Sequence, residues 1–120
     1  MISAEQSGGY AAVVSSGDEA AAFPLLWSAD LVTWEPRGAV FPSRADWPVW
    51  AASNMWAPEL HSVADTVVCY FSASHSNGRH SVGAAVSESG QPWGPYRDIG
   101  QPLVFHNEDS VVGLIGNIQQ

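Results

Sequence analysis

Basic residues are scarce in this sequence. Lysine is absent and only four arginines occur, against 12 acidic residues, so the formal net charge is -8 over 120 residues. Nucleic-acid binding needs clustered Lys and Arg to neutralise phosphates, and anionic membranes attract basic segments. We therefore expect neither a nucleic acid nor a membrane as partner. An acidic surface suits a neutral ligand, or simply favours solubility.

Cysteine and long apolar runs are equally scarce. Cys69 is the only cysteine, so no disulfide can form within the chain, and its apolar neighbours favour a buried position. No run approaches the roughly 18 apolar residues that span a bilayer. Residues 1–6 lack the basic start and the apolar stretch of a signal peptide, so the sequence assigns no compartment.

The histidines show no pattern typical of a metal site. No two of them have the spacing of ligands on one helical turn, and none is near a cysteine pair; they are His61, His75, His80 and His106. We therefore expect no metal and no cofactor in this chain.

Strand-like segments recur between residues that favour turns, and no stretch has helical periodicity. The sequence therefore predicts an all-β fold. The expected strands are Tyr10–Ser15, Phe23–Ser28, Gly38–Phe41, Ala57–Val63, Thr66–Ala73, His80–Val86 and Leu103–Phe105.

The two halves of the chain echo one another. Ser28 precedes Trp34 by the same interval that separates Ser87 from Trp93, and an apolar strand stands upstream of each serine. A repeated unit of four antiparallel strands is typical of β-propeller blades. The alternative is a two-sheet sandwich in which the echo is a coincidence.

Two such units predict an incomplete propeller. Propellers need about four to eight blades to close a ring, and an open pair leaves strand edges unpaired. We therefore expect residues 1–120 to form part of a propeller domain, about two four-stranded blades. Such a chain would be truncated, a fragment, or completed by another chain.

Six tryptophans are present, which fits an aromatic core and also flat platforms for sugar rings. Trp34 and Trp93 occupy equivalent positions in the echo, so we expect both to pack between blades. Trp56 differs, because it lies in the run Asn54–His61 beside Pro58. Pro58 lacks a backbone donor, which places the run at a strand start or a sheet edge and Trp56 at the mouth of its unit.

The order and spacing of several motifs resemble glycoside hydrolase family 43 over nearly the whole chain. This family of five-bladed propellers includes arabinanases, arabinofuranosidases and β-xylosidases. The matching segments include Ser28–Glu35 (SADLVTWE), Asn54–His61 (NMWAPELH) and Gly94–Leu103 (GPYRDIGQPL).

The resemblance implies hydrolysis of O-glycosidic bonds in polysaccharides that contain arabinose or xylose. An Asp acts as general base on water, a Glu as general acid and a second Asp tunes the acid, with inversion as the outcome. It also implies a carbohydrate partner and a role for Trp56 as a ligand contact. We expect Phe23 in the pocket wall and Glu59 along the cavity.

By this resemblance, the three acids have no carboxylate counterpart here. The base belongs ahead of Tyr10, yet residues 1–9 contain no Asp, and the acid belongs beyond residue 120. The tuning Asp falls on Gln119 or, in another register, on Gly116. We therefore expect no catalytic residue in this chain. The hypotheses are two blades of a glycosidase, a non-catalytic carbohydrate-binding or interaction module, and an inactive truncated gene product.

Overall fold

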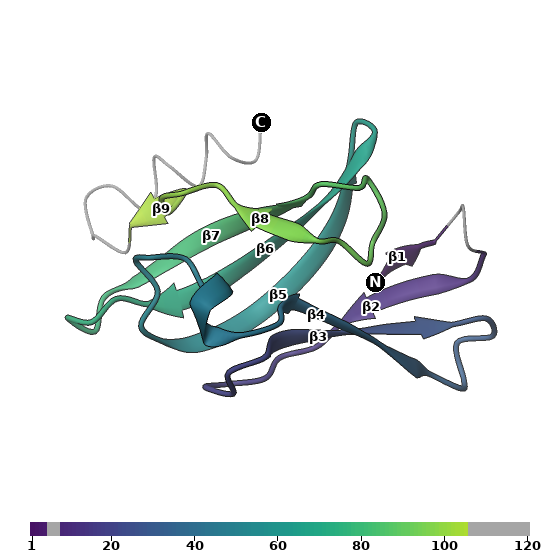
Figure 1. Cartoon of the computed structure of the whole chain (residues 1–120), viewed down its shortest axis with the longest axis horizontal. Coiled ribbons are helices and arrows are strands. Elements are labelled where there is room, and N and C mark those ends of the chain that lie inside the picture. Colours follow the sequence, from purple (N-terminus) through teal and green to yellow (C-terminus); the bar gives the residue numbers. More distant parts are fainter. Residues whose placement is uncertain (5–7, 106–120) are drawn as a thin grey trace.

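Two antiparallel β-sheets, one from each half of the chain, form the computed structural model, which describes residues 1–4 and 8–105 (Figure 1). The first sheet has the order β1-β2-β3-β4, and the second has the order β5-β6-β7-β8, with β9 also paired to β7. The first sheet contains β1 (Ile2–Ser3), β2 (Tyr10–Val13), β3 (Ala22–Ser28) and β4 (Glu35–Phe41). The short helix η1 (Arg44–Asp46) precedes β5 (Ser53–Val63), β6 (Thr66–Ser74), β7 (His80–Ser87), β8 (Tyr96–Asp98) and β9 (Val104–Phe105).

Every strand expected from the sequence has a counterpart, and two more strands are present. The additional strands, β1 and β8, span two and three residues, which is too short for an alternating pattern to show. Strands β4 and β5 begin earlier than predicted, because each continues through a proline, Pro36 and Pro58. Both are edge strands, whose outer donors need no partner, so the missing N–H costs little.

The echo between the two halves is visible in the turns that follow β3 and β7. Ser28 and Ser87 end these strands, and both are buried. The Ser28 hydroxyl oxygen accepts a hydrogen bond from the N–H of Leu31 at 2.8 Å. The Ser87 hydroxyl donates to the carbonyl oxygen of Gln91 at 2.6 Å. A buried serine thus organises the equivalent turn in each sheet.

An aromatic cluster joins the two sheets. Phe23 on β3 and Phe41 on β4 face Phe71 on β6, with ring centroids 5.3 and 5.4 Å from the Phe71 ring. Trp50, from the segment between β4 and β5, stacks on Phe71 at 6.0 Å with nearly parallel planes. Gly83 lies opposite Phe71, and an added Cβ there would approach the Phe71 and Trp50 rings to 2.6 Å. Glycine therefore makes the room that the two rings occupy.

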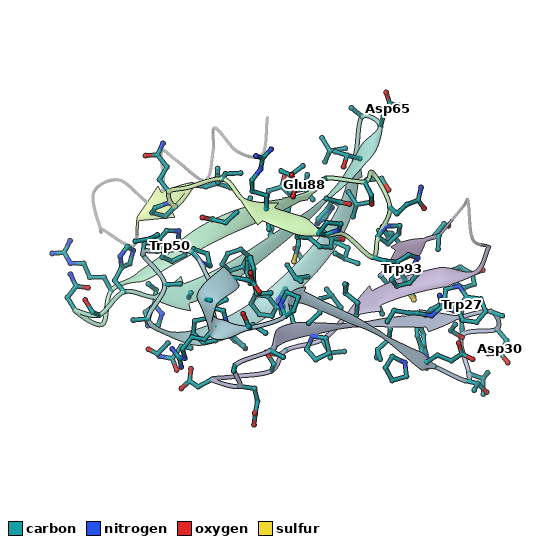
Figure 2. The ribbon with its side chains drawn as sticks, in the orientation of Figure 1. Trp27, Asp30, Trp50, Asp65, Glu88 and Trp93 are labelled. Carbon is teal, nitrogen blue, oxygen red and sulfur yellow. The ribbon has the colours of Figure 1, made fainter. Side chains whose placement is uncertain are left out.

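A guanidinium group bridges the sheets at a second place. The Cζ atom of Arg37 on β4 lies 4.8 Å from the ring of Trp27 and 5.6 Å from the ring of Trp93. Trp27 belongs to β3 and Trp93 to the turn before β8, and Figure 2 shows the two indoles near one another. Trp93 therefore packs between the sheets as predicted, whereas Trp34 is half-buried before β4 and its expected contact stays a prediction.

Replacing Phe71 by alanine should destabilise the fold strongly. The change removes the ring that three other aromatic side chains contact, and Phe→Ala changes in a core cost about 3–5 kcal/mol. Urea unfolding followed by tryptophan fluorescence measures the effect. Val49 is fully exposed, so Val49→Ala should leave the midpoint unchanged. Equal midpoints for wild type and Phe71→Ala would show that the cluster does not hold the sheets together.

The turn after β3 should add an acid-sensitive contribution to stability. Backbone N–H groups of Thr33 and Val32 donate to the Asp30 carboxylate and hold its pKa below the usual 3.8. A lowered folded-state pKa stabilises the fold above the unfolded pKa, and the contribution disappears as pH falls below about 4. Asp30→Asn should therefore be less stable than wild type at about pH 6, with the difference shrinking towards about pH 3. Asp65→Asn, at an exposed hairpin tip, is the control.

Candidate functional site

The first strand of the second sheet is distorted around Trp56. The pairing of β5 with β6 shifts register between Ser53 and Trp56 and again between Trp56 and Glu59. Asn54 and Ala57 have φ angles of 55° and 53°, a left-handed conformation that non-glycine residues adopt rarely. Between them the Trp56 side chain projects outward and stays 64% exposed. An exposed indole held by such backbone is a flat apolar platform on the surface.

A hollow of about 350 Å³ lies beside this indole. Gly17, Asn54, Met55, Trp56 and His80 line it. Met55 is fully buried and forms the apolar floor of the hollow. Asn54 and His80 contribute polar atoms to its lining. An apolar platform with polar groups at its edge is the usual arrangement for a small polar ligand with an apolar face.

Glu59 and His61 lie further along β5, on the same side of the strand as Trp56. Their side chains approach to 3.5 Å and are 73% and 52% exposed, so their ion pair, which needs a protonated histidine, is surface-screened. The His61 ring contacts Tyr70 edge-on at 5.4 Å. Glu59 lines a second hollow of about 660 Å³ between residues 1–3 and 58–62. Its contact with a sugar stays a prediction.

Phe23, expected in the wall of a binding pocket, lies in the core. Its side chain is fully buried, and its ring is 6.1 Å from Phe41 and 5.3 Å from Phe71. The reason is its place on the face of the first sheet that packs against the second sheet. The structure therefore gives Phe23 a packing role, with no ring surface left for a ligand.

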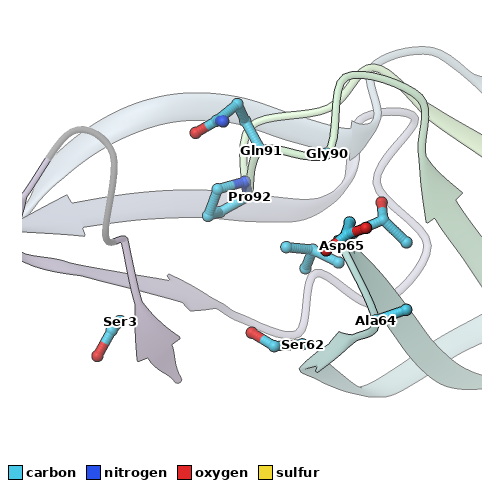
Figure 3. A pocket seen from close by; sticks show the side chains of 9 residues that line it. Ser3, Ser62, Ala64, Asp65, Gly90, Gln91 and Pro92 are labelled. Atoms are coloured by element: carbon cyan, nitrogen blue, oxygen red, sulfur yellow. The ribbon is translucent and has the colours of Figure 1, made fainter.

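A third hollow lies beside the hairpin that joins β5 to β6 (Figure 3). Its volume is about 610 Å³. The residues that line it are Ser3, Ser62, Ala64–Val67 and Gly90–Pro92. Among the described residues that line it, none is aromatic. Because sugar rings bind by stacking as well as by hydrogen bonds, the hollow beside Trp56 is the better candidate site.

Two serine–histidine pairs emerge that the sequence analysis did not anticipate. The Ser81 hydroxyl oxygen lies 2.7 Å from Nε2 of His75, and that of Ser74 lies 3.1 Å from Nδ1 of His80. The β6–β7 hairpin brings these residues together, and no sequence motif marks such pairs. Both serines are buried, so their hydroxyls serve as internal hydrogen-bond partners.

Burial raises the pKa of the Cys69 thiol to about 12 and keeps this thiol un-ionised.

Within residues 1–4 and 8–105 no cluster of three or more His, Cys, Asp or Glu side chains could hold a metal ion. The same part of the chain contains no helix long and apolar enough to cross a membrane. The two positions considered for the tuning Asp, Gln119 and Gly116, lie outside the described residues.

Solved glycoside hydrolase structures share this arrangement of sheets. The GH43_1 enzyme from Xanthomonas citri complexed with xylose is 29% identical, with a TM-score of 0.59 over 69% of this chain and 25% of its own. A GH43 beta-xylosidase/alpha-arabinofuranosidase from a compost microbial metagenome, in complex with xylotriose, is 26% identical, with a TM-score of 0.59. The match covers 68% of this chain and 24% of that enzyme. A thermostable family-43 glycoside hydrolase, 24% identical, shares the fold, with a TM-score of 0.60 over 80% and 35%.

These likenesses define the class as a partial β-propeller, which decides against the two-sheet sandwich. The family model of glycosyl hydrolases family 43 matches residues 1–110, so the chain belongs to that family, as the motifs predicted. The chain spans about a quarter of the length of the first two structures. A comparison with curated proteins gives no match.

Proposed function

We propose that this chain supplies one wall of a sugar-binding site in a family 43 glycoside hydrolase domain, with Trp56 as the stacking platform. The observation that carries the proposal is the outward, 64% exposed indole at the distorted start of β5. The C–H groups on one face of a pyranose or furanose ring pack on an indole, while the hydroxyls need hydrogen-bond partners at the edge. Asn54 and His80 lie at that edge.

Arabinose- and xylose-containing glycans are the proposed ligands. Support comes from the relatives that bind xylose and xylotriose and from one described as a beta-xylosidase/alpha-arabinofuranosidase. The lining agrees with a neutral ligand, because His80 carries the one titratable side chain among the five residues that form it. Glu59 lies three residues after Trp56 on β5. We propose it as a polar contact for the ligand on the side that faces residues 1–3.

Inverting hydrolysis is proposed for a whole family domain and not for this chain alone. That reaction needs a carboxylic acid and a carboxylate separated widely enough to admit a water molecule. By the family resemblance, the base belongs ahead of Tyr10, where residues 1–9 contain no Asp. The same observation favours the second candidate, a carbohydrate-binding module that does not hydrolyse its ligand.

The purified chain should not hydrolyse 4-nitrophenyl β-xyloside or α-arabinofuranoside above the buffer rate. The reason is the missing pair of acids, and release of nitrophenolate measures it. A full-length family 43 xylosidase is the positive control. Turnover that Glu59→Gln abolishes would show that an acid of this chain is catalytic and that the expected positions are misassigned.

Trp56→Ala should weaken xylotriose binding by about 1 kcal/mol or more, roughly fivefold in Kd, because it removes the stacking surface. Isothermal titration calorimetry measures the change. Trp34→Ala is the matched control, since Trp34 is partly exposed and lies in the turn between β3 and β4, and it is not among the residues that line the hollow. Equal Kd values for wild type and Trp56→Ala would remove Trp56 from the site.

A further inference from the structure

The backbone on both sides of Trp56 is left-handed, which is an uncommon conformation for two residues so close together in a strand. Asn54 and Ala57 are both left-handed, a region that alanine rarely adopts and that asparagine tolerates better than most residues. Conformations of this kind persist only where surrounding contacts impose them. The direction of the Trp56 indole therefore depends on whatever fixes Asn54.

A loop of the first sheet supplies that contact. The loop spans residues 14–21, between β2 and β3, and it lies at the same end of the molecule as the start of β5 (Figure 1). Asp18 Oδ1 accepts a hydrogen bond from the backbone N–H of Asn54 at 2.6 Å. Gly17 forms an isolated antiparallel bridge with Met55. A short bond from an N–H to a carboxylate is stronger than one between neutral groups.

Asn54 is also held from its own sheet. Its Nδ2 atom donates to the Ser74 hydroxyl at 3.1 Å, and this hydroxyl lies 3.1 Å from Nδ1 of His80. The backbone of Asn54 is thus bound by the first sheet and its side chain by the second. Asp18 is the only one of these partners that crosses between the sheets through a side chain.

The loop that carries Asp18 is itself fastened. The Ser16 hydroxyl oxygen accepts a bond from the N–H of Phe23 at 2.9 Å, and Phe23 is a core residue. The indole N–H of Trp47 donates to the carbonyl oxygen of Ala20 at 3.0 Å. Asp18 therefore projects from an anchored loop, and its carboxylate can act as a fixed support.

We propose that Asp18 is a positioning residue for the Trp56 platform: its carboxylate holds the N–H of Asn54 and so keeps the neighbouring indole aimed at the sugar. This inference rests on the proposed function. It makes the shape of the site depend on the docking of the two sheets, because the support and the platform belong to different sheets. Without the bond, we expect the backbone of Asn54 to be held less firmly and the direction of the Trp56 indole to become less fixed.

Three variants in the same loop test the proposal. Asp18→Ala removes the acceptor, Asp18→Asn keeps an acceptor oxygen without the charge, and Glu19→Ala removes an adjacent exposed charge as the matched control. Xylotriose Kd, from calorimetry, should rise at least threefold in Asp18→Ala, recover most of that loss in Asp18→Asn, and stay at the wild-type value in Glu19→Ala. The urea midpoint should change little in all three.

A double-variant measurement separates positioning from a general loss of stability. In the Trp56→Ala background, Asp18→Ala should weaken binding no further, because the residue it positions is gone. Additive losses, or equal losses in Asp18→Ala and Glu19→Ala, would overturn the proposal.

A readout without sugar keeps the inference distinct from the proposed function. Acrylamide quenching of wild type minus that of Trp56→Phe reports the exposure of the Trp56 indole. The same difference, measured in each variant with and without Trp56→Phe, should change in the Asp18→Ala background and stay at the wild-type value in the Glu19→Ala background. If wild type and Trp56→Ala bind xylotriose equally, the proposed function fails, whereas an unchanged quenching difference in Asp18→Ala sinks the positioning role alone.

Discussion

The contact between Phe71 and the two phenylalanines of the first sheet is the interaction on which the rest of this structure depends. Each sheet has one apolar face that it cannot bury by itself, and the aromatic rings of both sheets fill the space between those faces. Gly83 opposite Phe71 lets Trp50 complete the cluster from a segment that belongs to neither sheet. Burying apolar surface at this cluster brings the two halves of the chain together.

The candidate site follows from that docking. Once the sheets are packed, the loop of residues 14–21 reaches the start of β5, and Asp18 meets the backbone of Asn54. The hollow beside Trp56 takes Gly17 from one sheet and His80 from the other. Neither sheet alone would build it. The geometry of the proposed sugar platform therefore depends on how the two sheets dock.

Several residues show why the sequence led close to this arrangement without reaching it. Pro58 correctly indicated an edge strand, but it lies within β5, because the outer side of an edge strand needs no donor. Phe23 was expected at the surface of a pocket, since nothing in an alternating apolar pattern tells which face of a sheet another sheet will cover. Asp18 gave no signal at all, because its partner, Asn54, is distant in the chain and is held through its backbone.

The sequence by itself determined the all-β class, the two repeated antiparallel units marked by Ser28 and Ser87, and the membership of glycosyl hydrolases family 43. Local patterns indicate these features: the alternation of apolar residues along strands, the turn residues and the order of the motifs. Only the tertiary structure decided which aromatic rings enter the core, that Trp56 stands exposed between two left-handed residues, and that a carboxylate of the other sheet holds its neighbour. Those outcomes arise from contacts between distant segments, which form because each sheet must cover the apolar face of the other.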